Sequence, residues 1–409
     1  MRNVVFAAPF LMDATLRFVR AAASLPNVRL ALLTQEPLER VPEDLRARID
    51  AHWRVDDGLD PDAIERAVVE LARGMGNVSR LIGTLEQLQV PLGVVRRRLG
   101  IEGMDDATAE NFRDKGRMKD VLRAAGVPCA RHRKVTTADE AREFARATGF
   151  PLVVKPPAGA GAKSTFRVDT MEELDSAVRV AAPGAGREAQ IEEFVVGDES
   201  SFDTVTLGGK PVWHSLSHYR PTPLDVLRNP WIQWCVFVPR EVEHPRYDDI
   251  RTVAFRALRA LGMDTGVSHM EWFRRRDGSI AVSEVGARPP GAQFCTLHSW
   301  ANDFDFYAAW ARAAIFGEFT APERKYACGA AYLRGQGPEA GRVAAIHGLE
   351  QAQRELGSLV VEAKLPKPGQ SPSGGYEGEG YVILRHPETE VVERALARLV
   401  STVKVELRA

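Results

Sequence analysis

Apolar runs of strand length alternate with amphipathic segments over the first part of the chain. Residues 3–10 (NVVFAAPF), 28–34 (VRLALLT) and 79–84 (SRLIGT) predict buried strands, and residues 62–73 predict an amphipathic helix. Strands that alternate with helices are typical of a parallel α/β sheet. The first strand is not followed by a G-x-G-x-x-G sequence, so nothing indicates a dinucleotide-binding site in this sheet.

The middle of the chain predicts a larger, mixed set of elements. Residues 108–125 predict one highly charged helix that ends at Gly126-Val127-Pro128, because glycine adopts positive φ and proline cannot continue a helix. Asp277-Gly278 predicts a tight turn between two paired strands. The other expected elements are strands at 132–135, 151–155, 165–168, 188–195, 267–275 and 280–286, helices at 138–148, 171–181 and 245–261, and strands around a proline- and aromatic-rich insertion within 202–240.

The length of 409 residues suits two or three domains. The pattern changes near Tyr326, where shorter strands, helices and a loop rich in glycine and proline predict a smaller α+β domain. We therefore expect domains at residues 1–107, 108–322 and 323–409.

Composition and charge narrow the classes of function. The chain has 54 Lys and Arg against 55 Asp and Glu, a formal net charge of −1, which gives no electrostatic footprint for nucleic acid or an anionic membrane. The N-terminal apolar run is broken by Asp13 and Arg17 and is too short to span a membrane, so we expect a cytoplasmic enzyme. The cysteines form no C-x-x-C pair, which indicates neither a zinc site nor a redox pair: Cys129, Cys235, Cys295 and Cys328.

Lys155 ends a predicted strand and is followed by a loop of small residues, PPAGAGAKS. In such a loop, backbone N–H groups can approach phosphate oxygens closely. Lys163-Ser164 fits the end of a Walker A sequence, but Pro157 and Ala162 stand where that motif needs glycine. From this segment alone, a phosphate-contacting loop and a plain turn both remain open.

Two acidic segments can complete a nucleotide site. The strand end at residues 192–199 can pair its backbone with an adenine edge and offer an acidic side chain to a ribose, although an acidic strand end at the surface is the alternative. Glu271 and Glu284 lie on the two strands of the predicted hairpin and can face each other. As an exposed like-charge pair they would be destabilising, whereas two such carboxylates suit Mg²⁺, so we favour a metal site. Arg288, in E-V-G-A-R-P-P-G, can neutralise a phosphoryl group in transfer.

The order and spacing of these segments resemble the ATP-grasp superfamily, and the likeness covers residues 110–318 approximately. The resemblance implies an ATP-grasp fold of mixed α/β and α+β class. An N-terminal Rossmann-like parallel α/β domain and a small C-terminal α+β domain would flank it, and a lid subdomain would occupy residues 130–200 approximately. It also implies ATP and one or two Mg²⁺ ions as cofactors.

The resemblance gives the nucleotide-binding residues their roles. Lys115 matches the lysine that contacts the α-phosphate, and Lys155 matches the second lysine, which precedes the lid loop. The adenine hinge matches residues 192–195, beginning at Glu192, with the carbonyl of Glu193 and the N–H of Val195 at the base. The remaining matches are the ribose acid Glu199 and the lid residues Gly159, Gly161 and Ser164.

The resemblance also covers the reacting centre. Glu271 and Glu284 match the two metal-bridging carboxylates, and Arg288 matches the arginine of the family's E-x-N-x-R sequence. Gly286 stands where that sequence has a metal-ligating asparagine, which leaves the number of metal ions open. His269 shares a strand face with Glu271 and can contact the acyl phosphate or the nucleophile, with a packed or solvated histidine as the alternative.

The implied activity is ATP-dependent ligation of a carboxylate to an amine through an acyl phosphate, closest to the amino-acid and dipeptide ligase branch. Aromatic and basic residues of segment 213–239 either shape the substrate pocket or pack in a surface loop. The expected partners are a small-molecule carboxylate and amine, with no nucleic acid and no membrane, and a homodimer is compatible with the sequence. The alternatives are a biotin-carboxylase-like or formate-dependent purine enzyme and a non-catalytic ATP-binding module.

Overall fold

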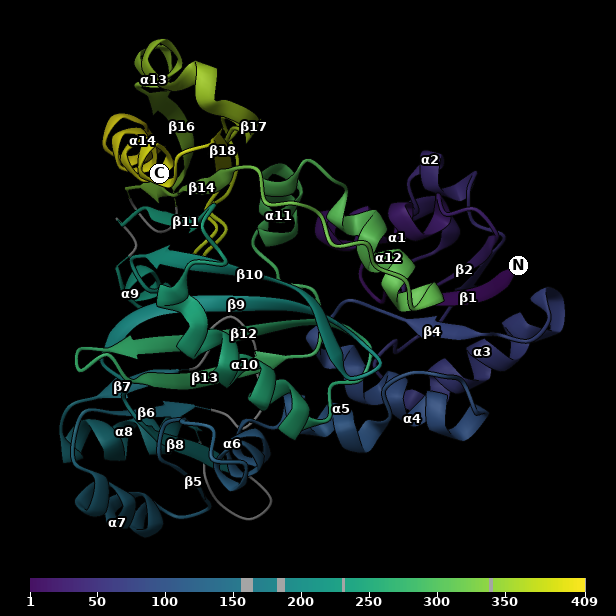
Figure 1. Cartoon of the computed structure of the whole chain (residues 1–409), viewed down its shortest axis with the longest axis horizontal. Coiled ribbons are helices and arrows are strands. Elements are labelled where there is room, and N and C mark those ends of the chain that lie inside the picture. The colour runs from purple at the N-terminus through teal and green to yellow at the C-terminus, as the bar shows by residue number, and fades with distance from the viewer. Residues whose placement is uncertain (156–164, 182–187, 230–231, 338–340, 409) are drawn as a thin grey trace.

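The computed structural model describes residues 1–155, 165–181, 188–229, 232–337 and 341–408 (Figure 1). Its N-terminal sheet is parallel, as the sequence predicted, and runs in the order β3-β2-β1-β4. The strands are β1 (Arg2–Ala7), β2 (Val28–Thr34), β3 (Ala51–Arg54) and β4 (Arg80–Ile82). The helices around them are α1 (Asp13–Ala23), α2 (Glu43–Arg46), α3 (Pro61–Met75) and α4 (Gln89–Leu99), with short turns η1 (Leu38–Arg40) and η2 (Glu86–Leu88).

The single helix predicted over residues 108–125 is wrong, because the structure has two helices there. They are α5 (Asp106–Arg113) and α6 (Lys115–Ala124). Asp114 separates them with an extended ψ of 109°, and its side chain accepts a hydrogen bond from the N–H of Arg117 at 2.8 Å. Aspartate is favoured at such a cap because it satisfies an N–H that has no partner within the helix. The break makes Lys115 the first residue of α6.

An antiparallel sheet in the order β5-β8-β6-β7 forms the segment expected as a lid. Its elements are β5 (His132–Val135), α7 (Ala138–Thr148), β6 (Leu152–Lys155), β7 (Phe166–Val168), α8 (Met171–Ala181) and β8 (Ala189–Glu193). Helices α7 and α8 have the predicted bounds. A Thr137–Glu140 capping box begins α7, and both helices bury one apolar face. This sheet lies at the lower left of Figure 1.

A longer antiparallel sheet crosses the middle of the molecule in the order β13-β12-β9-β10-β11-β14-β18-β17. Its first part contains β9 (Gly197–Leu207), β10 (Lys210–Arg220), β11 (Trp234–Val238), β12 (Gly266–Arg275) and β13 (Ile280–Gly286), with α9 (Pro223–Arg228), η3 (Pro245–Tyr247) and α10 (Asp248–Leu261). Helix α9 lies within the proline- and aromatic-rich insertion, for which no element was predicted. The helix expected over residues 245–261 is the turn η3 followed by α10.

The C-terminal segment extends this same sheet. Strand β14 (Ala327–Leu333) pairs with β11, followed by β18 (Gly380–His386) and β17 (Val360–Lys364). The sheet is therefore continuous across the predicted boundary at residue 322. The other elements are α11 (Phe294–Asn302), α12 (Phe306–Phe316), α13 (Leu349–Leu356), η4 (Gly357–Leu359), α14 (Thr389–Thr402) and the sheet β15-β19-β16, formed by β15 (Gly335–Gln336), β16 (Arg342–His347) and β19 (Lys404–Arg408).

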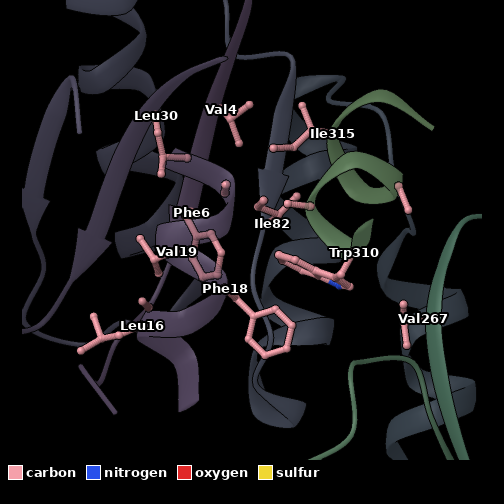
Figure 2. Packing of buried hydrophobic residues seen from close by; sticks show 14 of the residues in the cluster. Val4, Phe6, Leu16, Phe18, Val19, Leu30, Ile82, Val267, Trp310 and Ile315 are labelled. Carbon is pink, nitrogen blue, oxygen red and sulfur yellow. The ribbon is translucent and has the colours of Figure 1, made fainter. Parts of the chain in front are cut away.

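Helix α12 joins the N-terminal sheet to the long sheet through one apolar core (Figure 2). Trp310 lies between Phe6 of β1 and Phe18 of α1, with ring centroids 5.9 Å and 4.9 Å away. Val267 of β12 belongs to the same cluster. The burial of these rings holds the N-terminal unit against the sheet that carries the acidic residues.

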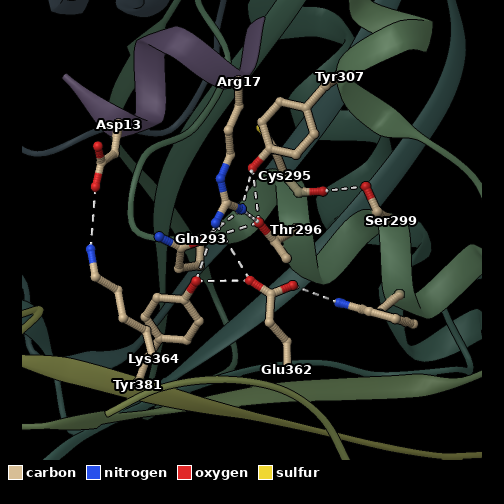
Figure 3. A network of polar contacts seen from close by, with 11 residues as sticks. Asp13, Arg17, Gln293, Cys295, Thr296, Ser299, Tyr307, Glu362, Lys364 and Tyr381 are labelled. Carbon is tan, nitrogen blue, oxygen red and sulfur yellow. Dashed lines mark hydrogen bonds and ion pairs between the residues drawn. The ribbon is translucent and has the colours of Figure 1, made fainter. Parts of the chain in front are cut away.

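Arg17 of α1 makes a polar connection to the C-terminal strands (Figure 3). Its guanidinium donates to the hydroxyls of Thr296 at 2.8 Å and Tyr381 at 3.2 Å, and it lies 3.5 Å from the carboxylate of Glu362. The Tyr381 hydroxyl donates in turn to Glu362 at 2.8 Å. Helix α1 thus contacts both α11 and the β17–β18 pair. No helix in the described part of the chain is both long and apolar enough to cross a membrane.

We expect Trp310→Ala to lower the free energy of unfolding by about 3–5 kcal/mol, because it removes a buried ring and leaves a cavity beside α1. Urea unfolding followed by far-ultraviolet circular dichroism measures the change. Trp53→Ala is the control, since Trp53 is 39% exposed and its loss should change stability by less than about 0.5 kcal/mol. Equal losses in the two variants would contradict the role of Trp310 in this core.

Candidate functional site

The described residues that the sequence predicted as a site line one cavity of about 410 Å³. It lies where the N-terminal unit, the lid sheet and the long sheet meet. The predicted residues on its wall are Lys115, Lys155, Glu192, Glu193, Val195, Glu199, His269, Glu271, Glu284 and Arg288. Gly159, Gly161 and Ser164 lie outside the described residues, as does Trp231 of the aromatic segment.

Two lysines share the carboxylate of Glu192 at the lid side of the cavity. Lys155 Nζ lies 2.8 Å from Glu192 Oε2, and Lys119 Nζ lies 3.0 Å from Glu192 Oε1. Burial lowers the pKa of Lys155 to about 8, although the charge of Glu192 opposes this effect. Burial alone would raise the pKa of Glu192, but the two ammonium groups hold it well below its usual range. Glu192 therefore carries its charge inside the site rather than at an exposed hinge.

Lys119 was missed by the sequence analysis, although a signal was present. It follows Lys115 by four residues, so the two side chains lie on the same face of α6. Lys119 is 0% exposed and also donates to the backbone carbonyl of Ser283 at 2.8 Å. A lysine this deeply buried needs a carboxylate partner, and Glu192 provides it.

Glu271 and Glu284 face each other across β12 and β13, which confirms the predicted pairing. The register depends on a β-bulge that the sequence did not reveal. Trp272 pairs with Val282 and Glu271 pairs with Glu284, so Ser283 is the extra residue. Without this bulge Glu271 would lie opposite Ser283, and Glu284 would point to the other face of the sheet.

The two glutamates have different electrostatic surroundings. Lys115 Nζ lies 2.6 Å from Glu284 Oε1. Burial raises the pKa of Glu284, but Lys115 and then Lys155 outweigh it and lower the value to about 2. Burial and the charge of Glu284 both raise the pKa of Glu271. A cation beside the pair would remove that repulsion. The arrangement therefore fits a divalent metal that takes its remaining ligands from phosphate oxygens.

The predicted adenine and ribose region forms another wall. Val195 lies with Ala130, Phe273 and Ala281 in a small apolar cluster, and the first three of these residues line the cavity. Such a surface can cover the face of a base. Glu199 lies beyond it, where burial and the charge of Glu271 raise its pKa well above the usual range. The side chain of Glu193 points to Arg131, at 3.1 Å, and to Arg275, at 3.3 Å.

Arg288 is held by a residue of the N-terminal unit that the sequence analysis did not find. Glu86 Oε2 accepts a hydrogen bond from Arg288 Nε at 2.8 Å. Burial would lower the pKa of Arg288, but the Glu86 carboxylate raises it. The same Glu86 oxygen lies 3.0 Å from the place that a Cβ would occupy at Gly286. Glu86 therefore fills space beside Gly286 that a side chain there would need.

Part of the aromatic segment reaches the cavity and part does not. Tyr219 and Trp234 line it together with Phe294 and Tyr376, which forms an aromatic wall. Trp213 instead packs against His298 and Phe306, with ring centroids 5.2 Å and 5.3 Å away. The prediction that segment 213–239 shapes a pocket therefore holds only for its cavity-facing residues.

The match to a known family agrees with this geometry. Residues 120–302 match the family model described as the ATP-grasp domain. This part of the chain is therefore similar to an ATP-grasp domain. The L-amino acid ligase structure from Bacillus licheniformis has a TM-score of 0.80 to this chain at 18% identity, covering 100% of this chain and 99% of that one. That likeness shows that the fold, including the flanking units, is shared.

Two curated proteins match a smaller share of the chain than this structure does. The L-arginine-specific L-amino acid ligase of Bacillus subtilis is 24% identical over 256 residues, which are 60% of this chain and 60% of that protein. An uncharacterized protein of Sinorhizobium fredii is 27% identical over 244 residues, which are 58% of this chain and 49% of that protein. The chain thus matches between about half and three fifths of the length of these relatives.

We expect Glu192→Gln to lower the free energy of unfolding by about 3–5 kcal/mol, because it leaves Lys119 and Lys155 buried without a counter-charge. Chemical unfolding at neutral pH measures the change. Glu193→Gln is the matched control on the same strand: its partners Arg131 and Arg275 are 58% and 31% exposed, so the loss should be below about 1 kcal/mol. Unchanged stability of the Glu192 variant would contradict the charge cluster.

Proposed function

We propose that this chain is an ATP-dependent carboxylate–amine ligase that forms an amide or peptide bond between amino-acid-like substrates through an acyl phosphate. The observation that carries the proposal is the convergence of Lys115, Lys155, the facing pair Glu271 and Glu284, and Arg288 on one cavity. Lysines next to paired carboxylates are what a polyphosphate with a divalent cation needs.

The charge distribution sets the direction of the nucleotide in this proposal. The apolar cluster at Val195 covers the base, and Glu199 accepts hydrogen bonds from the ribose. The phosphates extend toward Lys155 and Lys115, whose ammonium groups offset their charge. Glu271 and Glu284 would hold Mg²⁺, which would neutralise phosphate charge and polarise the phosphorus–oxygen bonds.

The reaction then follows from position and electrostatics. A carboxylate oxygen of the first substrate attacks the γ-phosphorus, the bond from that phosphorus to the ADP oxygen breaks, and an acyl phosphate forms. The amine nitrogen attacks the acyl carbon, inorganic phosphate leaves, and the nitrogen loses a proton. Arg288, fixed by Glu86, neutralises the phosphoryl oxygens in both steps. The surrounding walls keep water from hydrolysing the acyl phosphate.

The aromatic wall supports amino-acid-like substrates. Tyr219, Trp234, Phe294 and Tyr376 offer an apolar surface next to the charged groups, which suits a small molecule with one ionic and one apolar end. The relatives named as amino acid ligases agree with this choice.

An ADP-release screen with mass spectrometry of the products tests the proposal. Pairs of amino acids form the main arm, and bicarbonate with biotin or formate with a purine ribonucleotide form the other arms. We expect release that needs both an acid and an amine, together with a new amide product. Release with only bicarbonate or formate, or no release in any arm, would reject the amino-acid ligase.

We expect Glu271→Gln and Glu284→Gln each to reduce ligation by about 1000-fold or more, because the metal loses a charged ligand. ADP affinity, measured by calorimetry, should stay within about tenfold, since the lysines and the base-covering wall remain. Glu350→Gln on α13, whose side chain is 95% exposed, is the control and should ligate normally. Normal turnover of either site variant with Mg²⁺ would remove these glutamates from the metal site.

The affinity for ADP should fall as the pH rises above about 8. The pKa of Lys155 is lowered to about 8 by burial, so its positive charge is present below this pH and is lost above it. If only the charged form binds phosphate, the affinity falls by up to about tenfold per pH unit, and binding takes up a proton. Calorimetry in two buffers of different ionisation enthalpy measures both effects. Lys155→Arg should flatten the profile, whereas a flat wild-type profile would contradict the assignment.

A further inference from the structure

A second cavity, separate from the candidate active site, opens beside strand β10. Its volume is about 450 Å³, which suits a small molecule, and none of the described residues lines both cavities. Strand β11 has 5 residues and pairs with the 11-residue β10 only at residues 218–220. In the described part of the chain, the first half of β10 therefore pairs with no strand on that side. Residues 242–243 and 321–324 line the space that remains.

Arg324 brings a positive charge without a bonded counter-charge to this second cavity. Its Nη1 donates to the backbone carbonyl of Pro239 at 3.0 Å, and its Nη2 donates to the Ser215 hydroxyl at 2.5 Å. Its Nε is buried and has no hydrogen-bond partner among the described residues. Burial lowers the pKa of Arg324 to about 10, so the group stays charged at neutral pH. A guanidinium withdrawn from water with only neutral oxygens bonded to it gains from a bound anion.

The other charged groups on the wall of the second cavity do not supply that anion. Glu243 lies 3.3 Å from Arg251 and 3.4 Å from His214, so its charge serves these two residues. Glu243 and Glu323 are both exposed at the rim. Among the described residues that line this cavity, Arg324 is therefore the cation that lacks a carboxylate partner.

Asn302 places a hydrogen-bond acceptor near this charge. It lines the cavity and is 3% exposed. Its Nδ2 donates to the backbone carbonyl of His298 at 2.7 Å, and since a carbonyl only accepts, this contact fixes which end of the amide is the nitrogen. Its Oδ1 is buried and has no partner among the described residues. The segments of Asn302 and Arg324 are adjacent, because the N–H of Lys325 donates to the carbonyl of Ala301 at 3.2 Å.

We infer that the second cavity binds a free α-amino acid, whose carboxylate pairs with Arg324 and whose ammonium group donates to Asn302 Oδ1. A guanidinium only donates and an amide oxygen only accepts, so the two groups require an anionic acceptor and a donor in one small molecule. A simple anion would leave the Asn302 oxygen unpaired, and a simple cation would be repelled by Arg324. Trp213, Val242 and Phe255 also line the cavity and offer an apolar surface to the ligand's side chain. This site is additional to the proposed active site and does not depend on the ligase function.

Equilibrium dialysis of the intact protein without nucleotide tests the site. Each standard amino acid serves as a labelled probe, and the number of molecules bound per chain is measured with the affinity. Arg324→Gln removes the charge, so we expect the affinity for at least one amino acid to fall by about tenfold or more. Arg142→Gln is the matched control and should bind normally, because Arg142 is a half-buried arginine on α7 that pairs with Asp175 and does not line the cavity.

Ala321→Trp blocks the cavity without removing a polar group. Ala321 is exposed and lines the cavity, so a large side chain can occupy the space while the fold is kept. We expect the bound amino acid that Arg324→Gln weakens to disappear in this variant too. Thr320→Trp is the control, because Thr320 is also exposed but does not line the cavity. Thermal midpoints without ligand that match the wild type show that the fold is kept.

Asn302→Leu tests the ammonium contact, because leucine has a similar volume but no acceptor. In the wild type, we expect the amino acid to bind about tenfold or more tightly than the carboxylic acid that lacks its amino group. In Asn302→Leu the two affinities should agree within about threefold. Equal affinities already in the wild type would overturn the assignment of a zwitterion to this cavity.

The outcomes distinguish the second cavity from the proposed active site. An amino acid bound at the active site remains bound in Arg324→Gln and Ala321→Trp, whereas one bound in the second cavity is lost. If both variants bind as many molecules per chain as the wild type, with the same affinities, the second cavity holds only water and the inference is overturned. The presence or absence of ligase activity changes neither result.

Discussion

The neutralisation of buried charge is the constraint on which the rest of this site depends. Lys119 and Lys155 are withdrawn from water and share the carboxylate of Glu192, which lies between them on the lid sheet. Removing Glu192 would leave two ammonium charges that the surrounding apolar residues cannot solvate. The lid sheet is therefore bound to helix α6 by a buried ion pair.

The same constraint operates at the paired glutamates with the opposite result. Lys115 balances Glu284, but the pKa of Glu271 is raised by burial and by its neighbour. The site thus has one carboxylate whose charge is compensated and one that gains from a bound cation. This asymmetry supports the metal site that we propose at this pair.

The architecture brings distant segments to the cavity and holds them there. Trp310 packs the N-terminal sheet against α12, and Arg17 connects α1 to the C-terminal strands (Figure 3). As a result, Glu86 can reach Arg288 from a different sheet. Asp203 of β9 bonds His269 of β12 and His298 of α11 in the same way. Glu284, Arg288 and His269 are thus each held by a partner from another element.

Local patterns in the sequence determined the element types and many of the site residues. The spacing of apolar positions predicted α7 and α8, and Asp277-Gly278 with its flanking strands predicted that Glu271 and Glu284 would face each other. These features depend on neighbours within a few residues, as side-chain period and turn chemistry do. Only the tertiary structure decided the bulge at Ser283 that makes this pairing possible, and the partners Glu86, Lys119 and Asp203. Their contacts join residues far apart in the chain, and one residue of register changes which face a side chain occupies, so no local pattern could specify them.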